Sequence, residues 1–232
     1  MKIGSTEWED LIIKGAEAFG LDVNHKMTTQ FGIHGNELIK WTKKINLTSI
    51  TDPERVAVKH FLDSIAPARF VYPAAAVLDI GSGGGFPGIP LKILIPSISV
   101  LLIDGSRKKV NFLKHIIRKL NLADIDARQI RAEELAQDSN FTNVFDVIIS
   151  RASSALGPFV KVALPLLADN GIIIALKGTV DQREINDVRS NVFKNLKNLK
   201  SDQNRYSLAL EEYNLPFTQS KRSIITIRKV RL

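Results

Sequence analysis

The segment from residue 76 to residue 176 alternates short apolar runs with amphipathic stretches, and this alternation constrains the fold more than any other feature of the sequence. The apolar runs are rich in Val, Ile and Leu and have the length of buried strands. They cover residues 76–80, 99–104, 125–130, 145–150 and 171–176. Between the second and third runs, Val110, Leu113, Ile117 and Leu120 repeat at helical spacing. Because strands covered by helices on both faces read as continuous apolar runs, we predict an α/β fold with a mostly parallel, doubly wound sheet.

The residues before the first strand read as three helices. The first runs from about residue 6 to residue 19, and a weaker second one spans residues 31–45 and is interrupted by Gly32 and Gly35. The third begins with Asp52 as the N-cap and Pro53 at the first helical position, and it ends before Pro67. We therefore predict a small N-terminal helical cap region.

The residues after the fifth strand read as one helix and two more strands. The helix is polar and covers residues 181–199, and the strands cover residues 205–213 and 222–230. They bring the sheet to about seven strands. We expect the helical cap region to span residues 1–72 and the α/β domain to span residues 73–232.

Composition excludes several classes of protein. The chain has 232 residues and no cysteine, which excludes disulfides, thiolate metal sites and a cysteine nucleophile. Its four histidines are scattered without metal-binding spacing, so we expect no metal. No apolar run approaches the ~20 residues of a membrane span. We therefore expect a cytoplasmic protein that does not act at a membrane.

The charge is unevenly distributed along the chain. The formal net charge is +8, and residues 177–232 contribute 12 Lys and Arg against 6 Asp and Glu. A basic surface attracts polyanions, most often nucleic acid. A generic solvated surface of a basic protein explains the same numbers, and charge alone leaves both interpretations open.

A glycine-rich loop follows the first predicted strand. It holds Gly81, Gly83 and Gly85, with Phe86 where a dinucleotide-binding GxGxxG motif needs its third glycine. Glycines at this place allow positive φ and let a ligand approach the backbone closely. The phenylalanine weakens the interpretation as a nicotinamide or flavin site.

Acidic residues stand on each side of this loop. Asp79 precedes it, where its carboxylate is placed to meet an ammonium group, and Asp104 closes the second strand, where it is placed to bind the hydroxyls of a ribose. Two acids without a P-loop lysine suit a positively charged nucleoside, and S-adenosylmethionine is such a ligand. Simpler roles remain open: Asp104 as a cap of the next helix and Asp79 as an acceptor for loop amides.

Cationic residues end the fourth and fifth predicted strands. Arg151 offers hydrogen-bond donors that suit guanine O6 and N7, and a structural ion pair is its alternative role. N7 carries a lone pair and no proton, so its methylation requires positioning and electrostatics without a general base. For Lys177, a phosphate contact competes with plain solvent exposure.

Several blocks of the sequence together resemble the bacterial 16S ribosomal RNA guanine-N7 methyltransferases, also called the glucose-inhibited division protein B family. The blocks are residues 41–49, 60–65, 78–90, 101–113, 150–152 and 176–178. The resemblance implies a class I S-adenosylmethionine-dependent methyltransferase with a Rossmann-like sheet and a helical N-terminal cap. It implies as substrate a guanine N7 of 16S ribosomal RNA, presented as free RNA or in the small ribosomal subunit. We expect a monomer.

The resemblance also assigns roles to individual residues. It places cofactor contacts at Gly81, Phe86, Ala132, Glu133 and Arg151, with Asp104 as the ribose acid and Arg151 also positioning the substrate. Asn46 and His60 are expected in the wall of the RNA-binding site, with helix capping and packing as their alternative roles, and Glu133 alternatively favours a helix N-terminus. Two other functions remain open: a noncatalytic RNA-binding or cofactor-sensing protein, and a methyltransferase for a small molecule or a protein.

Overall fold

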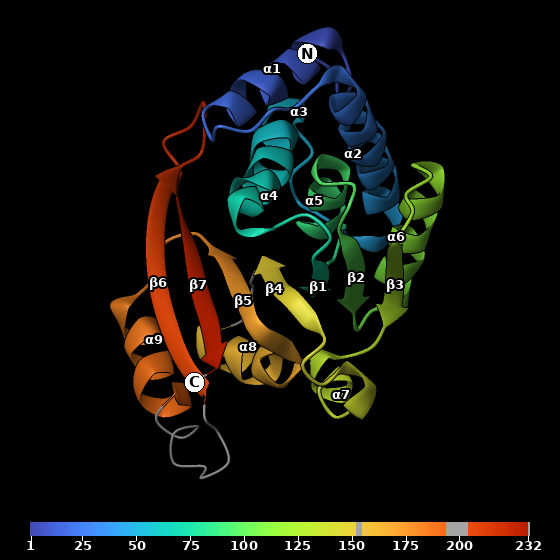
Figure 1. Ribbon diagram of the computed structural model, residues 1–232. Helices are drawn as coiled ribbons and strands as arrows, with labels where there is room; N and C mark the ends of the chain where they lie inside the picture. Colours follow the sequence, from blue (N-terminus) through green and yellow to red (C-terminus); the bar gives the residue numbers. More distant parts are fainter. Residues whose placement is uncertain (152–154, 194–203, 232) are drawn as a thin grey trace.

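A computed structural model describes residues 1–151, 155–193 and 204–231 and shows a seven-stranded sheet with helices on both faces (Figure 1). The strand order is β3-β2-β1-β4-β5-β7-β6. The strands are β1 Ala76–Ile80, β2 Ser99–Asp104, β3 Ile125–Gln129, β4 Phe145–Arg151, β5 Leu167–Lys177, β6 Asn204–Asn214 and β7 Lys221–Arg231. Strands β1 to β5 are parallel, whereas β7 is antiparallel to both of its neighbours. This confirms the predicted mostly parallel sheet.

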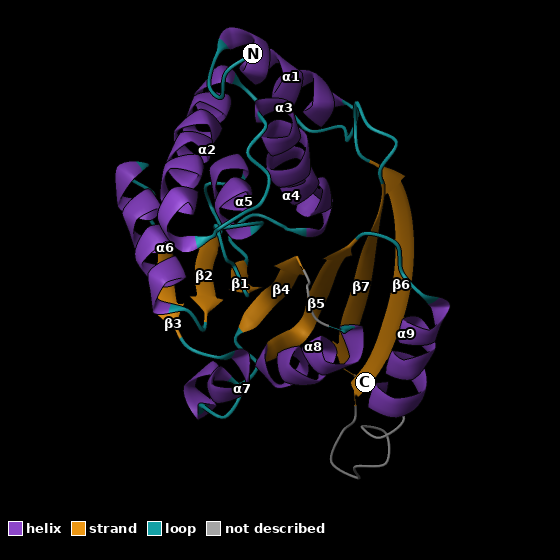
Figure 2. Ribbon diagram, turned by 180° about the vertical axis from the view of Figure 1, so that it is seen from behind, coloured by secondary structure: helices purple, strands orange, loops and turns teal. Residues whose placement is uncertain are grey.

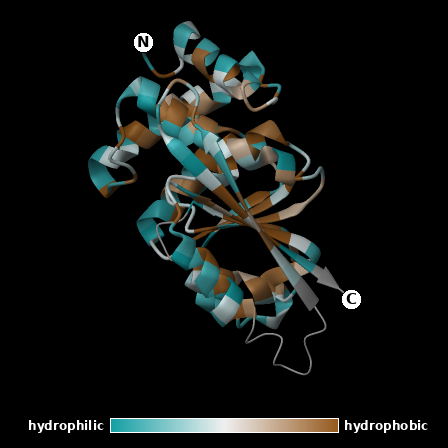
Figure 3. Cartoon of the chain, turned by 90° about the vertical axis from the view of Figure 1, so that its left-hand side faces the viewer, coloured by the Kyte–Doolittle hydropathy of each residue, from teal (hydrophilic) through white to brown (hydrophobic). Residues whose placement is uncertain are grey.

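Two helical layers cover the sheet, and the apolar residues concentrate between the layers (Figures 2 and 3). On one face α5 and α6 pack together with the N-terminal helices, and on the other face lie α7, α8 and α9. These helices are α5 Gly88–Leu94, α6 Arg107–Lys119, α7 Ala132–Leu135, α8 Leu156–Ala163 and α9 Gln182–Asp187. Among the described residues, no helix is long and apolar enough to cross a membrane.

The N-terminal helices α1 (Thr6–Glu17) and α2 (His25–Ile45) share one core with the sheet. The predicted interruption of the second helix is wrong, because α2 runs through both glycines without a break. A Cβ on Gly32 would lie 3.0 Å from Gly4 Cα, and one on Gly35 would lie 3.0 Å from Ile3 Cγ2. These glycines therefore allow the first residues of the chain to pack closely against α2.

The third predicted helix is divided. Asp52 is its N-cap and accepts a hydrogen bond from Arg55 N, as predicted, but α3 (Pro53–Val56) ends after one turn. A π-helical turn follows at Ala57–Leu62, and α4 (Asp63–Ile65) completes the segment. A single regular helix up to Pro67 is therefore a wrong prediction. A π-helical turn leaves carbonyl groups available for other donors, and such turns are frequent at functional sites.

The C-terminal part forms a hairpin in which the last strand, β7, lies between β5 and β6. The register pairs Lys177 of β5 with Ser223 of β7, so the start of β7 adjoins the end of β5. The predicted helix at residues 181–199 is α9 followed by a π-helical turn at Val188–Phe193; its remaining residues lie outside the described part. The parallel strands β1, β4 and β5 end at the same edge of the sheet, beside the start of β7.

Candidate functional site

The glycine-rich loop connects β1 to α5 and is held against β2. The amides of Gly81 and Ser82 both donate to the carbonyl of Ile103, at 2.9 and 3.0 Å. The φ angles are 72° at Gly81, 55° at Gly83 and 89° at Gly85, a region that residues with a Cβ rarely adopt. A Cβ built on Gly81 would meet no atom within 4 Å. The loop therefore leaves its backbone open to a ligand at the switch point between β1 and β4.

Asp79 is fully buried below this loop. Its Oδ2 accepts a hydrogen bond from Gly88 N at 2.9 Å, while its Oδ1 is buried without a hydrogen-bond partner in the described part of the chain. Burial raises the pKa of Asp79 to about 7. A positively charged group next to Oδ1 would stabilise the ionised carboxylate.

We expect Gly88→Ala to lower the free energy of unfolding by about 1–3 kcal/mol, because a Cβ there overpacks the loop. That atom would lie 2.4 Å from Leu102 Cδ2 and 2.8 Å from Asp79 Oδ2. Urea unfolding measures the effect. Gly105→Ala is the matched control, since its nearest contact is 3.7 Å away. Equal stability of the two variants would contradict the prediction.

Asp104 lies at the carboxyl end of β2 and touches the glycine-rich loop. Its Oδ2 accepts from Gly83 N at 3.1 Å and its Oδ1 from Ser106 N at 2.8 Å, while Lys109 Nζ is 3.7 Å from Oδ2. The side chain thus ties the loop to the start of α6. It combines a capping contact with a position beside the loop backbone, which suits a ligand with vicinal hydroxyls.

Ala132 and Glu133 are the first two residues of α7, after the end of β3. Glu133 is exposed and Ala132 is partly buried. The preceding residue, Arg131, packs against the loop after β2: its Cγ lies 3.7 Å from the position of a Cβ on Gly105. The structure therefore brings Glu133 to the same edge of the sheet as Asp104.

Phe86 anchors an aromatic cluster between the sheet and the N-terminal helices. Its ring stacks on His34 with a centroid distance of 4.7 Å and on His60 at 4.8 Å, and it meets Phe61 edge-on at 5.4 Å. The Nε2 of His34 donates to the carbonyl of Gly84 at 2.7 Å. A glycine at the third motif position would lack the ring on which this packing depends, so Phe86 fixes the cap against the loop.

We expect His34 to destabilise the fold as the pH falls. Burial lowers its pKa from 6.5 to about 4. Because the pKa of His34 is lower in the folded state than in the unfolded state, the free energy of unfolding decreases as the pH falls below the unfolded pKa. The decrease is about 2 kcal/mol between pH 8 and pH 5. His25→Gln is the control, because the imidazole of His25 is exposed. In urea unfolding, the free energy of unfolding of His34→Gln should decrease by about 2 kcal/mol less between pH 8 and pH 5 than that of His25→Gln.

Asp79 has the opposite effect on the free energy of unfolding. Its pKa is raised to about 7 in the folded protein, so the folded state favours the protonated carboxyl and becomes less stable as the pH rises through about 7. The comparison of the two histidine variants cancels this effect, since Asp79 is present in both. Parallel stability–pH curves for the two variants would show that His34 does not act as described.

Arg151 ends β4 and contacts the helical cap. Its Nη1 donates to the carbonyl of Lys59 at 2.9 Å, in the π-helical turn, and its Nη2 donates to His60 Nδ1 at 3.2 Å. The guanidinium carbon lies 4.9 Å from the centroid of the Phe86 ring. Burial, together with the charge of Arg151, lowers the pKa of His60 to about 3, so its imidazole is neutral and accepts. Its Nε2 then donates to Thr48 Oγ1 at 2.8 Å.

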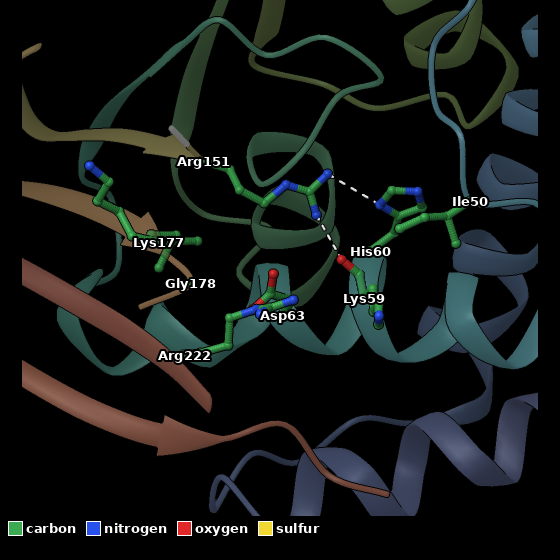
Figure 4. A pocket seen from close by; sticks show the side chains of 9 residues that line it. Ile50, Lys59, His60, Asp63, Arg151, Lys177, Gly178 and Arg222 are labelled. Atoms are coloured by element: carbon green, nitrogen blue, oxygen red, sulfur yellow. Dashed lines mark hydrogen bonds and ion pairs between the residues drawn. The ribbon is translucent and has the colours of Figure 1, made fainter. Parts of the chain in front are cut away.

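A cavity of about 320 Å³ lies at the ends of β4 and β5, between the cap and β7 (Figure 4). Its lining holds four cationic side chains and one acid, and it consists of Ile50, Lys59, His60, Asp63, Arg151, Leu176, Lys177, Gly178 and Arg222. The single acid, Asp63, accepts from Tyr213 OH at 2.8 Å and lies 3.3 Å from Arg222 Nε. Lys177 forms an ion pair with Glu184 of α9. The cavity therefore favours an anionic or acceptor-rich ligand.

Most of the site residues predicted from the sequence lie together in the structure, and Asn46 does not. The glycine-rich loop, Asp79, Asp104 and Arg151 lie together, and His60 and Lys177 join Arg151 in the cavity. Asn46 instead is the exposed C-cap of α2, with a φ of 49°, and does not line this cavity.

Sequence reasoning missed Lys59, Arg222 and Tyr213. They carry no local motif, and only the antiparallel pairing of β7 with β5 brings Arg222 beside Lys177. Among the described residues, no group of three or more His, Asp or Glu side chains is arranged to hold a metal ion.

Comparison with known proteins identifies the family of the chain. The model of the GidB family, described as rRNA small subunit methyltransferase G, matches residues 27–207. The protein belongs to this family. The match includes the glycine-rich loop and Arg151, and it confirms the family predicted from the sequence.

Relatives of this chain that are named ribosomal RNA small subunit methyltransferase G align with most of its length. The protein of this name from Geotalea uraniireducens (strain Rf4) is 39% identical over 220 residues, which cover 95% of this chain and 96% of the relative. The one from Geobacter metallireducens is 43% identical over 178 residues, or 77% and 80% of the two chains. An alignment over 95% of the chain includes both the N-terminal helices and the sheet.

Solved structures with a similar fold include a methyltransferase and a protein bound to AdoMet. A SAM dependent methyltransferase from Aquifex aeolicus has a TM-score of 0.53 at 15% identity, covering 82% of this chain and 97% of that chain. TYW2 of M. jannaschii in complex with AdoMet has a TM-score of 0.54 at 14% identity, covering 74% and 76%. These similarities confirm the predicted class I methyltransferase fold of this family member.

Proposed function

We propose that the protein transfers a methyl group from S-adenosylmethionine to N7 of a guanine in 16S ribosomal RNA. The observation that carries this proposal is the family match over residues 27–207, since relatives of the same name align over almost the full chain. The glycine-rich loop and the cationic cavity supply the two neighbouring sites that such a transfer requires. In this proposal residues 1–72 form a cap on the cofactor-binding domain of residues 73–232.

The residues around the loop fit S-adenosylmethionine. Its amino group is a cation that suits the buried, unpaired Oδ1 of Asp79, and its ribose hydroxyls suit Asp104. The open backbone at Gly81 and Gly83 would hold the methionine part of the cofactor, while Gly85 allows the loop to pack closely on Ile89, with Phe86 behind the loop. Ala132 and Glu133 are assigned to the adenine end. When bound, the cofactor supplies an electrophilic methyl group.

The chain's own residues position the acceptor. Guanine N7 has a free lone pair, so no side chain has to remove a proton, and the described cavity holds the base by donors. Arg151 is fixed by Lys59 and His60 and presents its charge beside the loop, while Lys177 and Arg222 line the cavity. Hydrogen bonds to O6 and attraction of the RNA phosphates would orient N7 toward the cofactor.

The target guanine lies in an exposed loop or is unstacked, because N7 in an RNA helix faces a deep and narrow groove. Such a substrate is found in free 16S ribosomal RNA or in the small ribosomal subunit. Since both are cytoplasmic, the proposal includes a cytoplasmic enzyme, acting as a monomer.

Labelled methyl transfer tests the proposal. The protein should transfer label to 16S ribosomal RNA that lacks the modification, and chemical cleavage at N7-methylguanine should map the label to one position. The absence of transfer to both naked RNA and small subunits would refute the assignment. Steady turnover would also exclude a noncatalytic RNA-binding or cofactor-sensing protein, which the intact loop and the names of the relatives already disfavour.

A further inference from the structure

Helix α6 carries six cationic side chains and no acidic one. These residues are Arg107, Lys108, Lys109, Lys114, Arg118 and Lys119. At about 100° per residue, Arg107, Lys114 and Arg118 lie within about 40° of one another on the helix. All three are exposed and, within the described part of the chain, form no ion pair. They make a continuous positive stripe opposite the buried face of Leu113 and Ile116.

The last turn of α2 extends this positive surface. Glu37 joins the two helices, because its carboxylate accepts from His115 at 2.7 Å and from Lys119 at 2.6 Å. Burial raises the pKa of Glu37, but these hydrogen bonds outweigh it and hold the pKa below its usual range. Lys44 follows Glu37 by seven residues, or about two helical turns, so it lies on the same side of α2. It is exposed and forms no ion pair among the described residues.

The first turn of α6 carries positive charge where the helix dipole disfavours it. Arg107 and Lys108 are the first two residues, and the first turn contains no acid. Cations near a helix N-terminus are unfavourable because the helix dipole is positive there. Lys109 compensates by lying 3.7 Å from Asp104, but the exposed pair has no such contact. A bound anion beside Arg107 and Lys108 would offset this unfavourable interaction with the helix dipole.

We propose that Lys44, Arg107, Lys108, Lys114 and Arg118 form a surface that binds the phosphate backbone of the substrate RNA. This α2–α6 surface begins at the cofactor edge of the sheet, since Arg107 follows Asp104 by three residues, and it extends roughly 16 Å along α6. It rests on the proposed function for the identity of the polyanion. An RNA held here would reach the cofactor edge of the sheet at Arg107 and Lys108.

Charge reversal on α6 tests this surface. Two double variants, K114E/R118E and R107E/K108E, are compared with K14E/K161E, which changes net charge equally on exposed lysines of α1 and α8. Binding of a 16S ribosomal RNA transcript is measured at several salt concentrations. The α6 variants should bind at least 10-fold more weakly than the control, and the slope of log affinity against log salt should fall by roughly 1–2.

Thermal unfolding separates binding from folding. R107E/K108E should melt at the same temperature as the wild type or higher, because glutamates suit the first turn of a helix, while its RNA affinity falls. Cofactor affinity measured by calorimetry should stay within threefold in K114E/R118E.

RNA affinity of K114E/R118E equal to that of K14E/K161E would overturn the proposal. An equal loss in all variants would also overturn it, since binding would then follow net charge alone. Failure of the proposed function is a separate result: the wild type would transfer no methyl group, whatever the α6 variants do to RNA affinity.

Discussion

Arg151→Met is expected to lower kcat/KM for methyl transfer to 16S ribosomal RNA by at least ~100-fold, the usual cost of removing one positioned donor next to reacting atoms. The variant removes hydrogen bonds to the Lys59 carbonyl and to His60 Nδ1, and it removes the charge that lies over Phe86. The kcat/KM of Arg151→Lys should lie between those of the wild type and Arg151→Met, because a lysine keeps the charge but cannot donate two hydrogen bonds in the geometry of a guanidinium.

Arg128→Met is the matched control for Arg151→Met. Arg128 also lies over a phenylalanine ring, Phe141 at 5.6 Å, and pairs with Asp126, but it is exposed on β3 and far from the cavity lining. Single-turnover rates, KM for RNA and thermal unfolding should be measured on both. If the single-turnover rate and the KM of Arg151→Met both stay within threefold of those of Arg128→Met, Arg151 has no part in positioning the substrate; thermal unfolding checks that both variants are folded.

Asp104→Asn is expected to weaken S-adenosylmethionine binding by about 100-fold, or about 2.7 kcal/mol. The carboxylate accepts from Gly83 N and Ser106 N, and an asparagine would turn its amide hydrogens toward one of these donors. Isothermal calorimetry with the cofactor and with its demethylated product measures the loss. Asp126→Asn on the neighbouring strand is the control, because Asp126 is exposed and remote from the glycine-rich loop.

Thermal unfolding of both aspartate variants distinguishes a lost contact from a damaged loop. Asp104→Asn should remain folded at the temperature of the titration and should lose affinity there. Affinities that are equal in the two variants would exclude Asp104 from the cofactor site.

Local patterns predicted most of the sheet because its central strands are buried on both faces. Runs such as residues 76–80 and 145–150 therefore consist mainly of apolar residues, with Asp79, Asp146 and Ser150 as the exceptions. The glycine-rich loop was found for the same local reason. Glycine itself misled the prediction in α2, since Gly32 and Gly35 lie in a helix interior where close packing outweighs their low helix propensity.

The cationic cavity lay beyond local reasoning because distant segments form it. Lys59 reaches the cavity from a π-helical turn that no local sequence pattern predicts. Arg222 reaches it through the pairing of β7 with β5. The net charge of the long central segment does not reveal the basic stripe of α6, since nine acids nearly balance eleven Lys and Arg between residues 76 and 176. The six cations stand out only within the single helix.

The position of β7 links the outer strand of the sheet to the cavity. Since β7 lies between β5 and β6, strand β6 is joined to the rest of the sheet through β7. Strand β7 also brings Arg222 to Asp63 in the lining of the cavity. It follows that a change that weakens the pairing between β5 and β7 would release β6 and open the cavity together.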